Sequence, residues 1–185
     1  MISTGDLKKG ATFEFENQPC SLLEWQHVKM GRGGAIVRMK LRNLRTGATF
    51  ERTCDAGEKF PRVILERSTV TYQYQDGDQY HFMDMQTYDD IVLTSAKLGD
   101  AKNYLIDNLE LDLVMLEDEA ISVEPPEKLV LRVEYAEPGF KGDTATGGTK
   151  PATTETGLVV QVPLFISAGD KIRVNTTTGA YVERA

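Results

Sequence analysis

The chain has 185 residues, of which 41% are hydrophobic and 26% are charged, as in a folded globular protein. It has no apolar run near the roughly 18 residues needed to cross a bilayer, and its first residues lack the apolar segment of a secretion signal. We therefore expect a cytoplasmic protein without a membrane partner. The two cysteines, Cys20 and Cys54, are too few for a disulfide framework and are expected to be free thiols.

The formal net charge of −7, taken alone, argues against a nucleic acid as partner. The charges are unevenly distributed, however. Residues 1–64 hold eleven basic and seven acidic side chains, residues 65–126 hold three and fourteen, and residues 127–185 hold seven of each. Between Gln26 and Phe50 there are six basic residues and no acid, so an anionic partner would meet a positive local field there.

Two strands are predicted on either side of the glycine-rich stretch KMGRGGA at residues 29–35. Glycine supplies the positive φ angles of a tight connection, so we expect a hairpin with Arg32 at its end. Any half-exposed strand can carry basic residues, but the unbroken positive sign favours a binding arm. The second strand alternates, with Val37, Met39 and Leu41 on one face and Arg38, Lys40 and Arg42 on the other.

A second hairpin is predicted in the stretch STVTYQYQDGDQYHFMDM, at Asp76–Gly77. Acidic residues surround its aromatic side chains, whereas grooves that bind nucleic acid are positive. We therefore expect core and cross-strand packing instead of base stacking. The aromatic set consists of Tyr72, Tyr74, Tyr80 and Phe82.

The rest of the chain is also dominated by strand patterns. Residues 98–110 form the one convincing helical stretch, with Asp100 in its first turn. The prolines of EPPEK at 124–128 mark a linker, and the Gly/Thr-rich residues 137–157 are predicted to form a long loop that contacts a partner. Many short strands with turns between them predict an all-β protein of three small barrels, at residues 1–64, 65–126 and 127–185.

One internal echo is visible, because TGATFER at residues 46–52 and TGAYVER at residues 178–184 agree at five of seven positions. Each segment starts at a glycine-containing turn and continues into a predicted strand. The sequence around them is not periodic, so we interpret the echo as shared turn chemistry and not as a repeat.

Motifs for catalysis are not found. His27 and His81 are far apart, and the sequence has neither a metal-ligand spacing nor a nucleophile elbow. The carboxylates at residues 87–90 and 116–119 belong to a generally acidic segment, which favours a solvated face over a general acid/base pair. In GDTATGGT, Gly148 stands where a phosphate-binding loop needs a lysine. We therefore expect no enzyme, no metal and no cofactor.

The chain resembles the bacterial elongation factor P family over essentially its whole length. The match is carried by VKMGRGGAIVRMKLRNLRTG, by YHFMDMQTYDDI and by the C-terminal stretch that starts at KGDTATGG. The resemblance implies an N-terminal SH3-like (KOW-like) barrel and two OB-folds, arranged as an L-shaped mimic of tRNA. In the C-terminal stretch, eight residues fit the family signature K-x-A-x4-G-x2-[LIV]-x-V-P-x2-[LIV]-x2-G: Lys150, Ala152, Gly157, Val160, Val162, Pro163, Ile166 and Gly169.

The resemblance also implies a function in translation. Family members bind the ribosome between the P and E sites, stabilise the P-site peptidyl-tRNA and stimulate peptide bond formation, which relieves stalling at consecutive prolines. We expect a monomer that contacts ribosomal RNA and has no catalytic residue of its own. The hairpin residues expected to meet tRNA or the ribosome are Lys29, Gly31, Arg32, Gly33, Gly34, Arg38, Lys40 and Arg42. The implied contacts of the C-terminal domain with tRNA and the small subunit are Gly142, Asp143, Thr144, Gly147, Gly148, Tyr181 and Arg184.

The hairpin tip departs from the family pattern. Many members have proline before the tip glycine, where Met30 stands, and many carry a modified lysine where Arg32 stands. Members with an arginine tip can carry rhamnose, but their loop usually reads S-G-R-N. Arg32 is therefore a candidate modification site, and a tip-modifying enzyme is a candidate partner. Two alternatives stay open: a paralogue with a different stall specificity, and a general RNA-binding protein.

Overall fold

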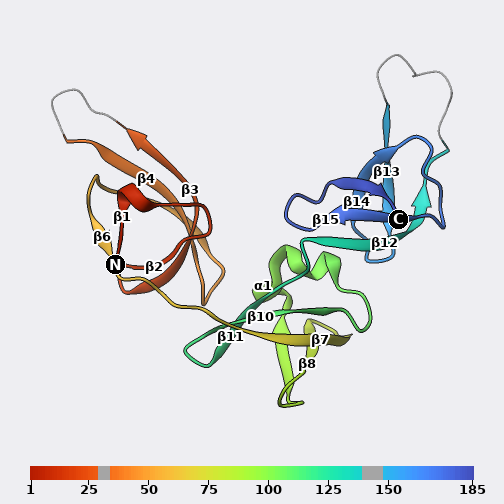
Figure 1. The fold of residues 1–185 in the computed structure, drawn as a ribbon, viewed down its shortest axis with the longest axis horizontal. Helices are drawn as coiled ribbons and strands as arrows, with labels where there is room; N and C mark the ends of the chain where they lie inside the picture. Colours follow the sequence, from red (N-terminus) through yellow and green to blue (C-terminus); the bar gives the residue numbers. More distant parts are fainter. Residues whose placement is uncertain (29–33, 139–147) are drawn as a thin grey trace. The chain divides into compact units, whose positions relative to one another are not determined.

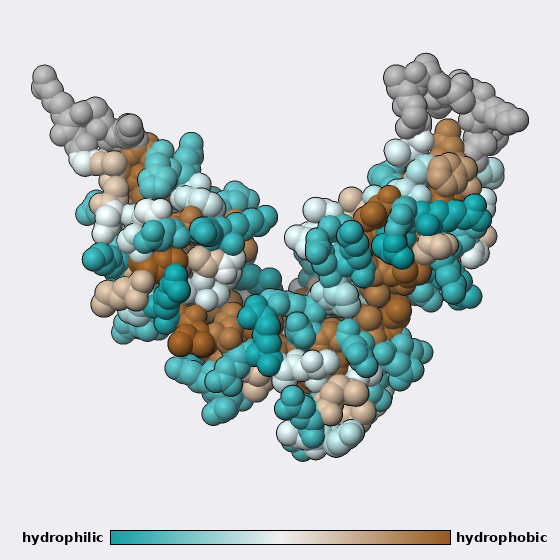
Figure 2. Space-filling model, viewed as in Figure 1, coloured by the Kyte–Doolittle hydropathy of each residue, from teal (hydrophilic) through white to brown (hydrophobic). Residues whose placement is uncertain are grey.

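The computed structural model describes residues 1–28, 34–138 and 148–185. In these ranges the chain forms three curled antiparallel sheets and one small two-stranded pair (Figure 1). The predicted all-β class is confirmed, whereas the domain boundaries after residues 64 and 126 stay a prediction. Hydrophilic residues cover most of the visible face of the chain, with smaller hydrophobic patches between them (Figure 2).

The N-terminal sheet has the order β2-β3-β4-β5, and β1 pairs with β6. Alternation along β4 turns Val37, Met39 and Leu41 inward, where they are fully buried beside Phe13 and Leu22 in one apolar core. This face of β4 is the one that the sequence predicts. The elements are β1 (Ile2–Ser3), η1 (Thr4–Asp6), β2 (Thr12–Phe15), β3 (Gln18–Val28), β4 (Ile36–Asn43), β5 (Thr49–Asp55) and β6 (Lys59–Phe60).

The middle sheet has the order β11-β10-β7-β8-β9. The predicted hairpin joins β7 to β8, and Gly77 takes the positive φ of 59° in its turn. Strand β9 is followed by the short helix α1 and then by the 3-10 helix η2. The elements are β7 (Glu66–Asp76), β8 (Gln79–Asp84), β9 (Asp90–Thr94), α1 (Ser95–Leu98), η2 (Gly99–Tyr104), β10 (Glu110–Leu116) and β11 (Glu119–Glu124).

The expectation of core and cross-strand packing for the aromatic set is confirmed, and Tyr74 belongs to the second kind, because its ring stacks on its cross-strand partner His81. Tyr72, Tyr80 and Phe82 are buried, whereas Tyr74 is 55% exposed. The register of β7 and β8 shifts between Tyr72 and Tyr74, which leaves Gln73 as an extra residue in β7. In a regular strand Tyr72 and Tyr74 share one face, so this bulge moves Tyr74 to the opposite face.

The predicted helix at 98–110 is wrong in its extent. The α-helix covers Ser95–Leu98, and a 3-10 helix continues over Gly99–Tyr104. Gly99 has a φ of 55°, which an α-helix cannot accommodate, so the regular helix ends there. The residues from Glu110 onward already belong to strand β10.

The C-terminal sheet has the order β14-β13-β12-β15-β16. Strand β13 corrects the prediction of a loop over 137–157, because a strand forms there despite Pro151. Pairing of β13 with β12 starts only at Ala152, so the position of Pro151 lies beyond the end of β12 and needs no ladder donor on that side. The elements are β12 (Lys128–Ala136), β13 (Thr149–Thr154), β14 (Val159–Pro163), β15 (Lys171–Asn175) and β16 (Tyr181–Arg184).

One turn geometry recurs in all three sheets. The side-chain oxygen of Asn43, Asp84 or Asn175 accepts hydrogen bonds from the backbone N–H groups two and three residues further on. Two of these turns lead into the similar segments at residues 46–52 and 178–184. The turn at Asp84 has no such sequence similarity, because Tyr88 stands where the other two turns have glycine. The left-handed position is held by Gly47 (φ 75°), Tyr88 (φ 62°) and Gly179 (φ 71°).

Candidate nucleic-acid interface

The predicted site residues divide into two groups. Residues 29–33 and 139–147 lie outside the described ranges. The tip residues Lys29, Gly31, Arg32 and Gly33, and the loop residues Gly142, Asp143, Thr144 and Gly147, therefore stay predictions. The structure describes Gly34, Arg38, Lys40, Arg42, Gly148, Tyr181 and Arg184.

Strand β4 runs between β3 and β5 and carries the basic side chains on its outer face. Arg38 is exposed, and Lys40 and Arg42 are half-buried, while the residues between them are buried. The residues of β3 from Glu24 to His27, near the end of the strand, are exposed as well, because this part of the hairpin extends beyond the core. The hairpin thus forms an arm with a basic outer face, as the sequence predicts.

The three basic residues of β4 differ in their electrostatic surroundings. Lys40 lies between Glu24 on β3 and Glu51 on β5, and its Nζ is 4.0 Å from Oε1 of Glu24. A carboxylate on each side offsets much of the positive potential of the ammonium group. Counting charges between Gln26 and Phe50 leaves out these two carboxylates, because Glu24 and Glu51 lie just outside that segment in the sequence but beside Lys40 in the sheet.

Arg38 and Arg42 have uncharged cross-strand neighbours. The partners of Arg38 are Gln26 and Thr53, and those of Arg42 are Ser21 and Thr49. Each guanidinium carries a permanent charge and five donors. Arg38 and Arg42 therefore contribute more than Lys40 to the positive field of the arm.

A shallow groove lies on the arm and includes an aromatic residue that the sequence does not single out. Trp25 is 39% exposed at its edge. Trp25 pairs with the inward-facing Met39, so its side chain lies on the face of the sheet opposite to Arg38 and forms no stacking surface with it. The groove has a volume of about 500 Å³ and is lined by Glu24, Trp25, Gln26, Arg38, Lys40 and Glu51.

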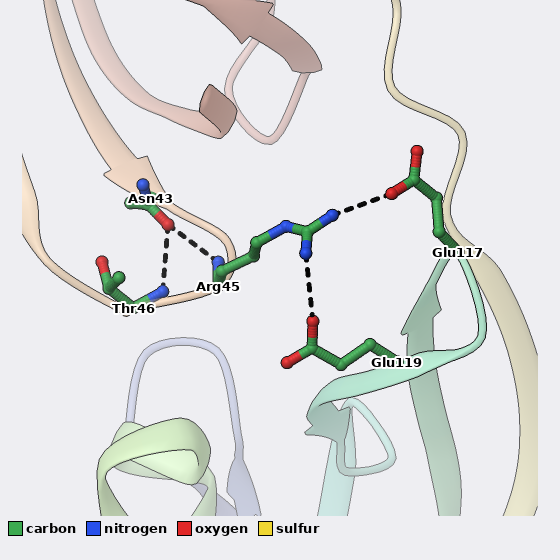
Figure 3. A network of polar contacts seen from close by, with 5 residues as sticks. All are labelled: Asn43, Arg45, Thr46, Glu117 and Glu119. Carbon is green, nitrogen blue, oxygen red and sulfur yellow. Dashed lines mark hydrogen bonds and ion pairs between the residues drawn. The ribbon is translucent and has the colours of Figure 1, made fainter. Parts of the chain in front are cut away.

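Arg45, another of the basic residues of this segment, makes an internal contact. It extends from the β4–β5 turn that Asn43 holds (Figure 3). Its guanidinium donates to Glu117 at 2.8 Å and to Glu119 at 3.5 Å. Residues 115–121, which bear these carboxylates, belong to the same compact unit as residues 1–66. The field that a partner meets is therefore weaker than the sequence count indicates.

In the C-terminal sheet, Tyr181 and Arg184 come to one side of the edge strand β16. Three residues apart, they would lie on opposite faces of a regular strand. The register shifts so that Tyr181 pairs with Val174 and Arg184 with Ile172, which leaves Val182 as an extra residue.

The two side chains already have contacts within the domain. Tyr181 is half-buried against the C-terminal core. Nη2 of Arg184 donates to Oδ1 of Asp170 at 2.8 Å, and the Arg184 side chain is still 57% exposed. Both residues can therefore meet a partner without a large rearrangement.

Most of the signature residues in this domain serve the fold. Ala152, Val160, Val162 and Ile166 are almost completely buried in its core. Lys150 is 7% exposed, and its Nζ donates to the backbone carbonyl of Glu137 at 2.7 Å. Such a bond satisfies a cation that is otherwise costly to bury.

Chemistry of other kinds finds little support in the described residues. Among them, no group of three metal-ligating side chains is close enough to hold an ion. Cys20 and Cys54 are buried free thiols, as expected. Burial raises the pKa of both, and that of Cys54 to about 11, so neither is a thiolate at neutral pH. No helix in the described ranges is long and apolar enough to cross a membrane.

The fold and the family models define a multidomain β-barrel protein of the KOW and OB types. Three models match the chain in succession: the elongation factor P KOW-like domain over residues 3–60, the elongation factor P OB domain over residues 65–123 and the elongation factor P C-terminal domain over residues 129–184.

Curated relatives match over the full length of both chains. Elongation factor P of Pelotomaculum thermopropionicum and that of a Thermoanaerobacter species are each 50% identical over 184 residues, covering 100% of both chains. A solved structure named as eukaryotic translation initiation factor 5A from Methanococcus jannaschii is 22% identical with a TM-score of 0.50, covering 66% of this chain and 89% of that one. The latter likeness concerns the fold alone. The chain belongs to the elongation factor P family and is a translation elongation factor.

Proposed function

We propose that this elongation factor binds the ribosome between the P and E sites and stabilises the P-site peptidyl-tRNA. In this way it stimulates peptide bond formation and relieves stalling at consecutive prolines. The supporting observation is the outer face of the arm, where Arg38 and Arg42 stand beside uncharged neighbours. Its partners are the P-site tRNA and ribosomal RNA, and it acts as a cytoplasmic monomer.

The physical basis of the proposal is positioning. Proline is a poor nucleophile for peptide bond formation because its ring restricts the geometry of attack, so a misplaced peptidyl-tRNA is especially harmful. A rigid protein that holds the tRNA near the attack geometry lowers the entropic part of the barrier. The arm gives reach, and Arg32 at its tip brings donors for phosphates or base edges. Peptide bond chemistry itself stays with ribosomal RNA.

The proposal is tested by the synthesis of a peptide with three consecutive prolines on purified ribosomes. We expect Arg32→Ala to lower the rate strongly, and we expect the stimulation by wild-type protein to weaken with salt, because phosphate contacts release counterions. Arg132→Ala is a matched control, since Arg132 is an exposed arginine of strand β12 far from the arm in sequence. Equal rates for Arg32→Ala and wild type would show that the tip does not contribute.

Two further measurements separate the remaining alternatives. The intact mass of the native protein decides whether Arg32 carries a rhamnose or another group, and with it whether a modifying enzyme is a partner. Ribosome profiling in a deletion strain decides between consecutive prolines and another stall motif, as expected of a paralogue. A general RNA-binding protein would bind free single-stranded RNA tightly, and the fourteen acidic residues of 65–126 make weak binding the expected result.

A further inference from the structure

Tyr74 is the member of the aromatic set that the core does not use. Its side chain is 55% exposed, whereas Tyr72 and Tyr80 are 7% and 8% exposed. On the outer face of the middle sheet its ring stacks on the ring of His81, with centroids 4.3 Å apart and an angle of 12° between the planes. One side of the Tyr74 ring is thereby covered, and the exposed part is available to a partner.

The strand registers place nine residues in three rows on this outer face, which we call the middle-sheet grid, and of these Thr71, at one corner, is buried. Adjacent rows are roughly 7 Å apart and adjacent strands about 4.8 Å apart, so the grid has the dimensions of a short extended peptide. Its central row is aromatic and aliphatic, and Val92 in that row is 42% exposed. The rows are Asp76, Gln79 and Thr94; Tyr74, His81 and Val92; and Thr71, Met83 and Asp90.

The charge of the grid is negative. Asp76 and Asp90 occupy opposite corners, and a carboxylate oxygen of Asp90 lies 3.1 Å from Nδ1 of His81. A carboxylate can only accept, so Nδ1 is the donor, and this bond holds the imidazole against Tyr74. All nine residues of the grid lie in the described part of the chain, and none of them is a lysine or an arginine.

We propose that the middle-sheet grid docks a basic segment of a protein. An arginine or lysine of that segment lies over the ring of Tyr74, because the negative face of an aromatic ring attracts a cation. Asp76 and Asp90 supply countercharge on either side of the central row, and the acidic surroundings steer the partner to this face. The proposal concerns a surface of its own and does not rest on the ribosomal function.

Other occupants fit the grid less well. A groove that stacks nucleic-acid bases also needs positive charge for the phosphates, and the grid has the opposite sign. A second copy of the same face would set carboxylates against carboxylates, which is unfavourable. A basic peptide satisfies both the ring and the carboxylates at once.

The test uses the full-length protein and a fluorescein-labelled peptide of alternating arginine and glycine. Fluorescence anisotropy gives the dissociation constant, and amide chemical shifts of labelled protein locate the site. We expect the shifts to concentrate on β7, β8 and β9, and Tyr74→Ser to weaken binding about two- to fivefold, as expected for loss of an exposed cation–π contact. We also expect Asp76→Asn combined with Asp90→Asn to weaken binding and to flatten its salt dependence.

Two controls make the result decisive. Tyr135 on β12 is 61% exposed in a domain with balanced charge, so Tyr135→Ser should leave peptide binding unchanged. Val92→Lys places a cation in the central row and should lower peptide binding even if Tyr74→Ser folds poorly. The proposal is overturned if Val92→Lys binds like wild type, if the shifts spread evenly over the carboxylates of 65–126, or if an oligouridine perturbs the same amides more strongly than the peptide.

Discussion

The N-terminal and middle domains use the same structural parts for opposite chemistry. Each has a turn built on the side chain of Asn43 or Asp84, and each exposes a face of three antiparallel strands. The N-terminal face carries arginines beside neutral neighbours, whereas the middle face carries carboxylates beside an aromatic pair. The comparison shows that the backbone pattern sets where side chains stand, and that single residues then decide which partner the face can take.

The turns differ in the same way. In the N-terminal turn a neutral amide accepts the hydrogen bonds and Gly47 takes the left-handed position. In the middle turn a carboxylate accepts them and Tyr88 takes that position. The middle turn therefore has a dependence on pH and a backbone strain that the N-terminal turn lacks.

The largest effect is expected for the removal of the buried amide of the N-terminal turn. Asn43→Ala leaves two backbone N–H groups and the side chain of Gln18 without their partner, which should cost about 2–3 kcal/mol of unfolding free energy. Trp25 is the single tryptophan of the chain, so its fluorescence during urea unfolding reports the N-terminal domain. Asn175→Ala is the matched variant, measured by amide exchange of β15 and β16. Because its turn is only half-buried, we expect a smaller loss of unfolding free energy than for Asn43→Ala. Equal losses would contradict the role of burial.

The arm offers a test of the difference between Lys40 and its neighbours. Arg38→Ala should weaken binding to ribosomes that carry P-site tRNA by up to about tenfold, and should flatten the dependence of log affinity on log salt by about one. Lys40→Ala should change both quantities less, because Glu24 and Glu51 already offset its charge. Binding measured over a series of salt concentrations checks both variants. A larger effect of Lys40→Ala than of Arg38→Ala would show that Glu24 and Glu51 do not offset the charge of Lys40.

The sequence predicts the strand faces well and the contacts across them poorly. Alternation identifies the buried and exposed faces of β4, because periodicity depends on one strand alone. Three contacts that matter depend on one extra residue in a strand: Leu23 brings Glu24 opposite Lys40, Gln73 brings Tyr74 opposite His81, and Val182 brings Arg184 opposite Ile172. A bulge of this kind shifts every later pair and has no reliable sequence signal, so the sequence does not separate Tyr74, which packs across the strands on the exposed face, from the aromatic residues of the core.

A smaller effect is expected for the exchange of the left-handed residues. Tyr88→Gly should raise the stability of the middle domain by about 1 kcal/mol, because glycine adopts a φ of 62° without strain and Tyr88 is 70% exposed and loses little packing. Gly47→Ala should lower the stability of the N-terminal domain by a similar amount. Amide exchange of β8 and β9 and the fluorescence of Trp25 follow the two domains separately. Stability changes of the same sign in Tyr88→Gly and Gly47→Ala would show that the left-handed backbone at Tyr88 is not strained.

The smallest effect is the dependence of the middle turn on pH. Hydrogen bonds from the backbone N–H groups of Thr87 and Gln86 lower the pKa of the Asp84 carboxyl below its ordinary value of 3.8. A group whose pKa is lowered by folding stabilises the folded state at any pH above the ordinary value. That stability decreases as the pH falls below 3.8, because the unfolded state then binds the proton first, and it is gone once the folded carboxyl is protonated as well.

Asp84→Asn isolates this contribution from the other carboxylates. The variant keeps an acceptor oxygen in the turn, as Asn43 and Asn175 do in the other two domains, and it cannot titrate. The stability of the middle domain, measured by amide exchange of Gln86 and Thr87 between pH 6 and pH 3, should therefore fall more steeply in wild type than in the variant. Parallel curves would mean that the Asp84 carboxylate is no better bonded in the folded chain than in water, and that the asparagine and aspartate turns are equivalent.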